Sequence, residues 1–205
     1  MLNIIKKDIL FNKKFIIIAI LYSLIFPIFL IIDGEEKYMF MNFLIPLVST
    51  GIIIGKICYL EDCGDVRMYL KSLPIGRYKH VLSRYIEMLV ILIASLIYLV
   101  IVQSFVTKDL SLSYIIKINI FIILLYTIYY SIYLMLFFTK NYYTAQNSLI
   151  FLVFGGLLVS LFLQKVLKVQ IDVSSLLHGQ YIIGLFFVTI LSLIITFFIS
   201  IKFNN

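Results

Sequence analysis

Apolar residues along this chain gather into six long stretches that are separated by short polar segments. A bilayer core of about 30 Å needs about 20 apolar residues of helix, so stretches of this length predict membrane-spanning helices. They cover approximately residues 15–32, 39–60, 85–105, 115–139, 148–163 and 181–201. We therefore expect an all-α integral membrane protein with six transmembrane helices, in which residues 1–205 form a single transmembrane domain.

The segment before the first stretch has an amphipathic pattern. Leu2, Ile5 and Ile9 fall near one side of a helix, and Asn3 and the lysines Lys7 and Lys14 fall on the other. A helix of this kind lies along a membrane surface, with its apolar side toward the acyl chains. We expect an N-terminal interfacial helix on the inner leaflet.

A second irregular segment, residues 164–180, separates the last two apolar stretches and is only about half polar. A loop with this many apolar residues is not expected to lie free in water. The alternation in "KVQIDVS" is compatible with a short strand or with a helix that re-enters the outer leaflet. Both alternatives remain open.

A polar insert of about residues 61–84 follows the second apolar stretch. It opens with Glu61, Asp62 and Asp65, and acids suit the positive N-terminal end of a helix. Apolar side chains then recur at i, i+3, i+4 and i+7, which is helical spacing, at Val66, Tyr69, Leu70 and Leu73. The pattern predicts a short amphipathic helix from about residue 61 to residue 73.

Pro74 and Gly76 end this predicted helix, because proline interrupts helical hydrogen bonding and glycine favours turns. A longer helix is expected from Arg77 to about residue 104, with its first two turns projecting into the cytoplasm. The insert is then a cytoplasmic hairpin shaped for another protein to hold. The alternative from periodicity alone is a solvated connection with a charged face.

The composition supports a membrane protein and sets its orientation. Hydrophobic residues make up 63% of the chain and charged residues 13%, against about 25% charged in soluble domains, and the mean hydropathy is +1.11. Twelve Lys and Arg residues fall on one side of the predicted spans and five on the other, so the positive-inside rule places both termini in the cytoplasm of a plasma-membrane protein. The net charge of +7 does not indicate nucleic acid, because the basic residues are dispersed at helix ends.

The sequence lacks the residue patterns that proton transport and nucleotide binding require. Glu87, Lys117 and Lys56 fall near the ends of spans, so no charge marks a proton path at the midplane. The sequence "GIIIGK" departs from a phosphate-binding loop in spacing and in its last residue, which leaves no visible nucleotide site. We expect no catalytic residue, metal or cofactor in this chain.

The two cysteines and two histidines fit that expectation. Cys58 and Cys63 have neither redox nor zinc spacing and are interpreted as reduced thiols. His80 and His178 are predicted on opposite sides of the membrane, so they cannot share a metal ion.

Two further patterns allow alternative interpretations. Gly51 and Gly55 form a small-xxx-small motif, which permits close approach of helices either between two copies of the chain or within one. Four tyrosines share one face of the fourth stretch and either line a substrate path or pack against neighbouring helices: Tyr126, Tyr129, Tyr130 and Tyr133.

The segment "MYLKSLPIGRYKHVLSRYIEMLV" resembles the one that follows the second span in permease subunits of small six-span type-2 ABC exporters of Gram-positive bacteria. The "SLP" turn of that family is matched by Ser72, Leu73 and Pro74. Its basic positions are matched by Arg77 and Lys79, and the run into the next helix by Val81, Leu82, Arg84 and Tyr85, with Arg84 where lysine is usual. The likeness covers the whole chain in span count and placement, but only this segment is specific.

The resemblance implies that residues 61–73 form a coupling helix, which docks into a separate ATP-binding subunit that holds ATP and Mg²⁺. Val66, Tyr69, Leu70 and Leu73 would fill its groove, while Arg67, Lys71 and Arg77 would make polar contacts at the edge. It also implies two permease copies, a homodimer by our expectation. Permeases that export amphipathic, cytolytic peptides, or confer resistance to them, are the most similar in size and layout. The alternative function is a non-transporting membrane anchor or sensor that recruits an ATPase, and an intramembrane enzyme ranks third.

Overall fold

The computed structural model describes residues 2–32, 38–64, 66, 76–106, 111–148, 150 and 179–203, and the regular elements in these residues are helices. They are α1 (Leu2–Phe11), α2 (Lys13–Ile32), α3 (Tyr38–Asp62), α5 (Arg77–Val106), α6 (Leu112–Thr139) and α9 (Gly179–Phe203). Residues 142–148 are helical as well. A helix satisfies its own backbone hydrogen bonds, as a chain in lipid must, so the fold is all-α as expected.

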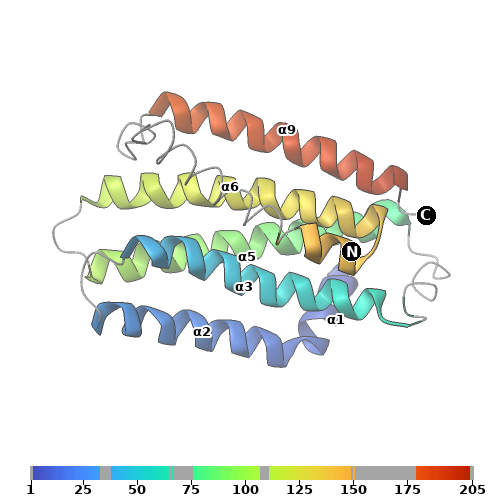
Figure 1. Cartoon of the computed structure of the whole chain (residues 1–205), viewed down its shortest axis with the longest axis horizontal. Coiled ribbons are helices and arrows are strands. Elements are labelled where there is room, and N and C mark those ends of the chain that lie inside the picture. The colour runs from blue at the N-terminus through green and yellow to red at the C-terminus, as the bar shows by residue number, and fades with distance from the viewer. Residues whose placement is uncertain are drawn as a thin grey trace.

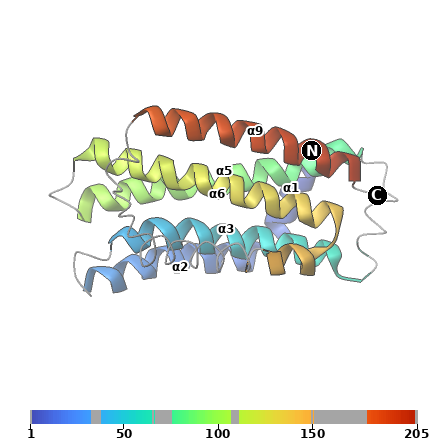
Figure 2. The same cartoon turned by 45° about the horizontal axis from the view of Figure 1, so that its top comes forward.

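Five long helices run side by side along the longest axis of the molecule, with α9 at one edge and α2 at the other (Figures 1 and 2). The closest neighbours along the bundle are α9 with α6, α6 with α5, α5 with α3, and α3 with α2. One end of the bundle carries α1, the end of α3 and the start of α5, together with the last residues of α6 and α9. Both termini therefore lie toward this end, which we call the terminal end.

Within the described residues, four helices are long and apolar enough to cross a membrane: α3, α5, α6 and α9. The successive helices α1 and α2 meet at a bend of 70°, and they make a fifth candidate if this bent pair counts as one span. The protein is thus a multi-pass membrane protein. The fifth predicted span, 148–163, and the outer segment, 164–180, lie almost wholly outside the described residues, so six spans remain a prediction.

The bend between α1 and α2 lies at Asn12, where the backbone hydrogen bonds continue although the axis turns. The backbone N–H of Asn12 donates to the Asp8 carbonyl at 2.9 Å, and its side-chain amide donates to the same oxygen at 3.0 Å. A helix is thus present at the predicted position as α1, and its place along the membrane surface stays a prediction. Its inward side carries buried Asp8, whereas Ile9 and Phe11 are 54% and 77% exposed on the surface that lipid would cover.

A cluster of buried amide side chains lies at the end of the bundle opposite the terminal end. The side-chain amide of Gln103 on α5 donates to the carbonyl oxygen of Asn42 on α3, and Asn119 on α6 donates to Gln103 Oε1 at 2.7 Å. All three side chains are at most 4% exposed. Amides hydrogen-bonded to one another satisfy groups that lipid cannot, so this amide cluster ties three helices together.

The start of α5 differs from the sequence expectation. Val81 and Arg84 are fully buried and Tyr85 is 4% exposed, so α5 packs into the bundle from its second turn, whereas residues 77–79 of its first turn are exposed. The physical reason is that acidic side chains of neighbouring helices neutralise Arg84 and allow this stretch to be buried. Residues 81–84 of the predicted hairpin therefore pack against the bundle, and the position of the hairpin of residues 61–84 relative to the membrane stays a prediction.

Candidate functional site

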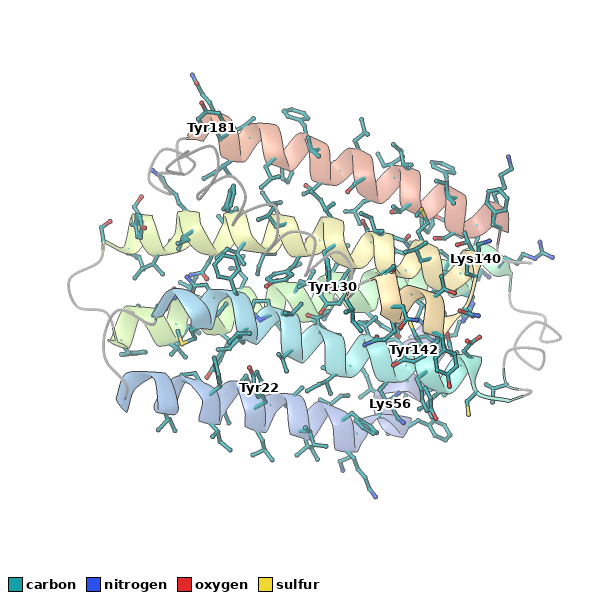
Figure 3. The ribbon with its side chains drawn as sticks, in the orientation of Figure 1. Tyr22, Lys56, Tyr130, Lys140, Tyr142 and Tyr181 are labelled. Atoms are coloured by element: carbon teal, nitrogen blue, oxygen red, sulfur yellow. The ribbon has the colours of Figure 1, made fainter. Side chains whose placement is uncertain are left out.

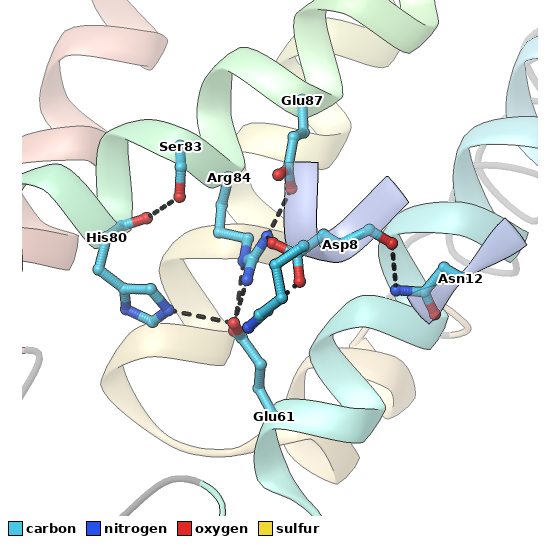
Figure 4. Close-up of polar contacts among 8 residues, drawn as sticks. Asp8, Asn12, Glu61, His80, Ser83, Arg84 and Glu87 are labelled. Carbon is cyan, nitrogen blue, oxygen red and sulfur yellow. Dashed lines mark hydrogen bonds and ion pairs between the residues drawn. The ribbon is translucent and has the colours of Figure 1, made fainter. Parts of the chain in front are cut away.

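Arg84 is the centre of a buried charge cluster at the terminal end of the bundle (Figure 4). Its guanidinium donates Nε and Nη2 to the two carboxylate oxygens of Glu61, which makes a two-pronged contact. Its Nη1 donates to Asp8 Oδ2 and to Glu87 Oε2, each at 2.6 Å. Arginine suits this position because its planar guanidinium presents five donors in a fixed geometry.

The acidic members of the charge cluster are as buried as its arginine. Asp8, Glu61 and Glu87 are 5%, 5% and 8% exposed. Charges removed from water in this way are stable only when they are paired and hydrogen-bonded. Among the described residues, Glu87 Oε1 has no hydrogen-bond partner, so the Glu87 carboxylate is satisfied on one side only.

Two further residues complete the cluster. His80 Nε2 lies 3.1 Å from Glu61 Oε1, and its ring packs edge-on against Phe138 of α6. Lys7 Nζ lies 3.4 Å from Asp8 Oδ1 at the exposed side. Three carboxylates surround one guanidinium, and the cluster is therefore rich in negative charge unless His80 and Lys7 offset it.

The members of the charge cluster come from three separate helices. Asp8 lies in α1, Glu61 in the last turn of α3, and His80, Arg84 and Glu87 lie on one face of α5 at i, i+4 and i+7. Glu61 precedes the connection between α3 and α5, and Arg84 follows it. The contact between Glu61 and Arg84 holds the two ends of this connection together, and Asp8 joins α1 to the same arginine.

Asp62 extends this polar base toward α6. Its Oδ2 accepts a hydrogen bond from the backbone N–H of Tyr142 at 2.9 Å, just after the end of α6. The ring of Tyr142 also packs edge-on against that of Tyr59. The end of α3 thus contacts α5 and the helical segment at residues 142–148, and Arg84 connects it to α1.

The arrangement links α1, α3 and α5 at the terminal end of the bundle. Among the described residues, no group of three His, Cys, Asp or Glu side chains could hold a metal ion. Arg84 pairs with all three carboxylates of the charge cluster at once. Cys58 is buried and Cys63 is exposed, and both are free thiols.

The residues predicted for ATPase coupling divide between described and undescribed positions. Glu61 and Asp62 end α3, at the carbonyl end of a helix and not at the amino end of a separate one as expected. Val66 is helical and 43% exposed, and Arg77 begins α5. The others lie outside the described residues: Asp65, Arg67, Tyr69, Leu70, Lys71, Leu73 and Pro74.

The predicted glycine motif and tyrosine face meet each other within one chain. A Cβ added to Gly51 would lie 3.2 Å from the hydroxyl of Tyr130, whereas one added to Gly55 would meet nothing within 4 Å. The hydroxyls of Tyr126 and Tyr130 donate to the carbonyls of Phe43 and Leu47 at 2.7 and 2.5 Å. These contacts favour the intramolecular packing alternative for Gly51 and for both of these tyrosines.

Sequence reasoning missed Asp8 and Glu87 as partners of Arg84, and His80 as the partner of Glu61. The spacing of the three α5 residues was a usable signal, because i, i+4 and i+7 share a helical face. The contact of Asp8 with Arg84 spans 76 residues of sequence, and nothing in the local pattern of α1 indicates it.

Comparison with known proteins gives one match. The family model described as "ABC-2 family transporter protein" matches residues 3–205. No curated protein and no solved structure matches the chain.

Proposed function

The chain belongs to the ABC-2 transporter family, and from this membership we propose that it is the transmembrane subunit of an exporter driven by a separate ATP-binding subunit. In this proposal the chain itself hydrolyses nothing, and ATP and Mg²⁺ are held by the partner. Two copies of the chain form the path, and both termini lie in the cytoplasm.

The observation that carries the proposal is the charge cluster around Arg84. An ATP-binding subunit acts on a permease by moving the cytoplasmic segment that it holds. The connection between α3 and α5 contains the predicted coupling residues, and Glu61 and Arg84 fasten its two ends to each other. Displacement of that connection is then passed to both helices together and, through Asp8, to α1.

The most direct test changes the predicted docking residues in the connection between α3 and α5. Tyr69→Ala and Leu70→Asp together should reduce co-purification of the ATP-binding subunit strongly, because truncating a central aromatic anchor costs about 2 kcal/mol or more. Tyr181→Ala provides the matched control, since Tyr181 is an exposed tyrosine at the opposite end of the bundle. Undiminished retention of the ATPase by the double variant would refute the docking assignment.

We further propose that the cargo is an amphipathic peptide, as the family resemblance implies. Support for this cargo comes from the resemblance, because Tyr130 and Tyr133 of the predicted tyrosine face lie in the buried core of the bundle. The experiment is to reconstitute the complex in vesicles and measure ATP-dependent uptake of a labelled amphipathic peptide into inside-out vesicles. Co-purification of an ATPase without movement of any peptide would support the membrane anchor instead.

A further inference from the structure

A groove runs along one side of α3, from the middle of the bundle to its terminal end. It consists of two adjoining hollows of about 380 and 480 Å³ that share Gly51, Ile52, Gly55 and Gln146 as lining residues. Each hollow is within the range of about 300–1,000 Å³ found for ligand pockets. We call it the α3 groove.

The glycines of α3 make this groove. A side chain at Gly55 would meet nothing within 4 Å, so the space beside the helix is open at this level. Ile18 of α2 and Ile150 line opposite parts of the groove and are 49% and 48% exposed. Because these rims are on the outer surface of the bundle, the groove opens sideways to the bilayer.

Polar groups collect at the terminal end of the groove. Lys56 lies there close to Tyr142, whereas Tyr130 lies nearer the middle of the bundle (Figure 3). The Lys56 ammonium lies 4.4 Å from the centre of the Tyr59 ring and 4.9 Å from that of Phe15. Within the described part of the chain no carboxylate pairs with it, so aromatic faces alone stabilise this cation.

One basic group at one end of an apolar groove matches an amphiphile with one anionic end. On the predicted cytoplasmic side, the inner leaflet supplies anionic phospholipids, which are drawn to basic residues at the membrane surface. An acyl chain can enter from the bilayer without crossing water, because the groove opens sideways. A peptide would fit less well, because its backbone groups would need hydrogen-bond partners along the apolar floor at Gly51, Ile52 and Gly55.

We propose that the α3 groove binds an anionic phospholipid of the inner leaflet, with its phosphate at Lys56 and an acyl chain along Gly55 and Gly51. The bound lipid bridges α2 and α3 where the groove separates them. This inference does not rest on transport, and it holds whether or not the chain moves a peptide.

The test measures lipid binding to the purified chain by native mass spectrometry, using phosphatidylglycerol and phosphatidylcholine with the same acyl chains. Lys56→Gln should weaken phosphatidylglycerol binding about fivefold, the contribution of one basic residue near an anionic surface, and leave phosphatidylcholine unchanged. Lys56→Arg should restore binding. Lys202→Gln is the matched control, because Lys202 also lies over an aromatic ring, that of Phe203, but on α9.

A second variant tests the acyl chain. Gly55→Leu should fill the groove and reduce binding of both lipids, whereas Gly184→Leu, at an equally open glycine on α9, should not. If Gly55→Leu does not fold, the Lys56 variants alone decide the test. Glycerol phosphate at the same concentration as the lipid should not displace bound phosphatidylglycerol. If it does, the groove is a site for free phosphate groups and not for a lipid.

Three results would overturn the proposal. One is equal binding of phosphatidylglycerol by the wild type and Lys56→Gln. Another is a loss in Lys202→Gln as large as that in Lys56→Gln. The third is saturable binding of an amphipathic peptide that Gly55→Leu abolishes while phosphatidylglycerol binding is absent, which would assign the groove to a peptide.

Discussion

The guanidinium of Arg84 is the most consequential single group in the described bundle, because it is fully buried among three carboxylates. Removing one member of a buried charge pair leaves the other uncompensated, which costs about 3–5 kcal/mol. Replacing arginine by lysine keeps the charge but loses the planar contact with Glu61, since an ammonium cannot reproduce that geometry. Comparing a substitution that removes the charge with one that keeps it therefore separates the contribution of the charge from that of the planar geometry.

We predict that Arg84→Gln destabilises the protein by about 3–5 kcal/mol and that Arg84→Lys has a smaller effect. Thermal unfolding in detergent measures both. Lys79→Gln is the control, since it removes a positive charge from an exposed position on the same helix. If Arg84→Gln melts like Lys79→Gln, the cluster is not a stabilising contact.

At Gly51 and Gly55 a single methyl group tests how closely the helices approach. Alanine in place of glycine favours the helix by up to about 1 kcal/mol, and overpacking opposes it by about 1–3 kcal/mol. We predict that Gly55→Ala is stabilising and that Gly51→Ala is less stable than it, because only Gly51 faces the Tyr130 hydroxyl at 3.2 Å. Comparison of the two melting temperatures checks this, and equal values would contradict the close contact.

At the scale of elements, α1 is attached to the bundle through a charged side chain. Asp8 faces Arg84, while its apolar neighbours Ile9 and Leu10 point to the surface. Hydrogen bonds between charged groups contribute about 1.5–3 kcal/mol, so the position of α1 depends strongly on this one contact. An interfacial helix held in this way follows any movement of α5.

We predict that Asp8→Asn releases α1 from α5 and raises amide hydrogen exchange in residues 4–11 about tenfold, with α6 unchanged. Lys7→Gln is the neighbouring control, because Lys7 is partly exposed and contacts Asp8 from the outside. Exchange measured by mass spectrometry tests this. Unchanged protection in Asp8→Asn would show that apolar contacts, and not the ion pair, hold α1.

The elements also show what the sequence can and cannot predict. The apolar stretches 39–60, 85–105, 115–139 and 181–201 correspond to α3, α5, α6 and α9, because hydropathy and helical length are local properties. The partners of Arg84 are not local, since Glu61 lies 23 residues away and Asp8 lies 76. Glu61 was accordingly interpreted as the start of a helix by its charge alone, whereas it lies in the last turn of α3, where Arg84 and His80 contact its carboxylate.

At the scale of the whole molecule, the terminal end of the bundle is predicted to be cytoplasmic. The native thiols make this testable, because Cys63 is exposed at that end and Cys58 is buried. We predict that an impermeant maleimide labels Cys63 only in opened cells, and labels a cysteine placed at Glu36 in intact cells. A Cys63→Ser variant is the background for the second measurement, and labelling of Cys63 in intact cells would reverse the topology.

The two polar clusters lie at matched positions on α3 and α5. Asn42 and Glu61 are nineteen residues apart on α3, and Arg84 and Gln103 are nineteen apart on α5. At about 1.5 Å per residue this separation is about 28 Å, close to the thickness of the bilayer core of about 30 Å. The charge cluster and the amide cluster therefore join these helices at both edges of the membrane.

Because contacts join α3 and α5 at two separate levels, these helices cannot shift along each other without breaking both. A shift of one turn, about 5.4 Å, between α3 and α5 would separate Glu61 from Arg84 and Asn42 from Gln103 in the same step. The two helices are therefore expected to move together as one rigid unit. The residues that α9 buries are small hydroxyl side chains, Thr189, Thr196 and Ser200, and α9 packs against the core mainly through apolar side chains. Among the described residues no ion pair joins α9 to α5, so a movement of α9 along the bundle would break no such contact.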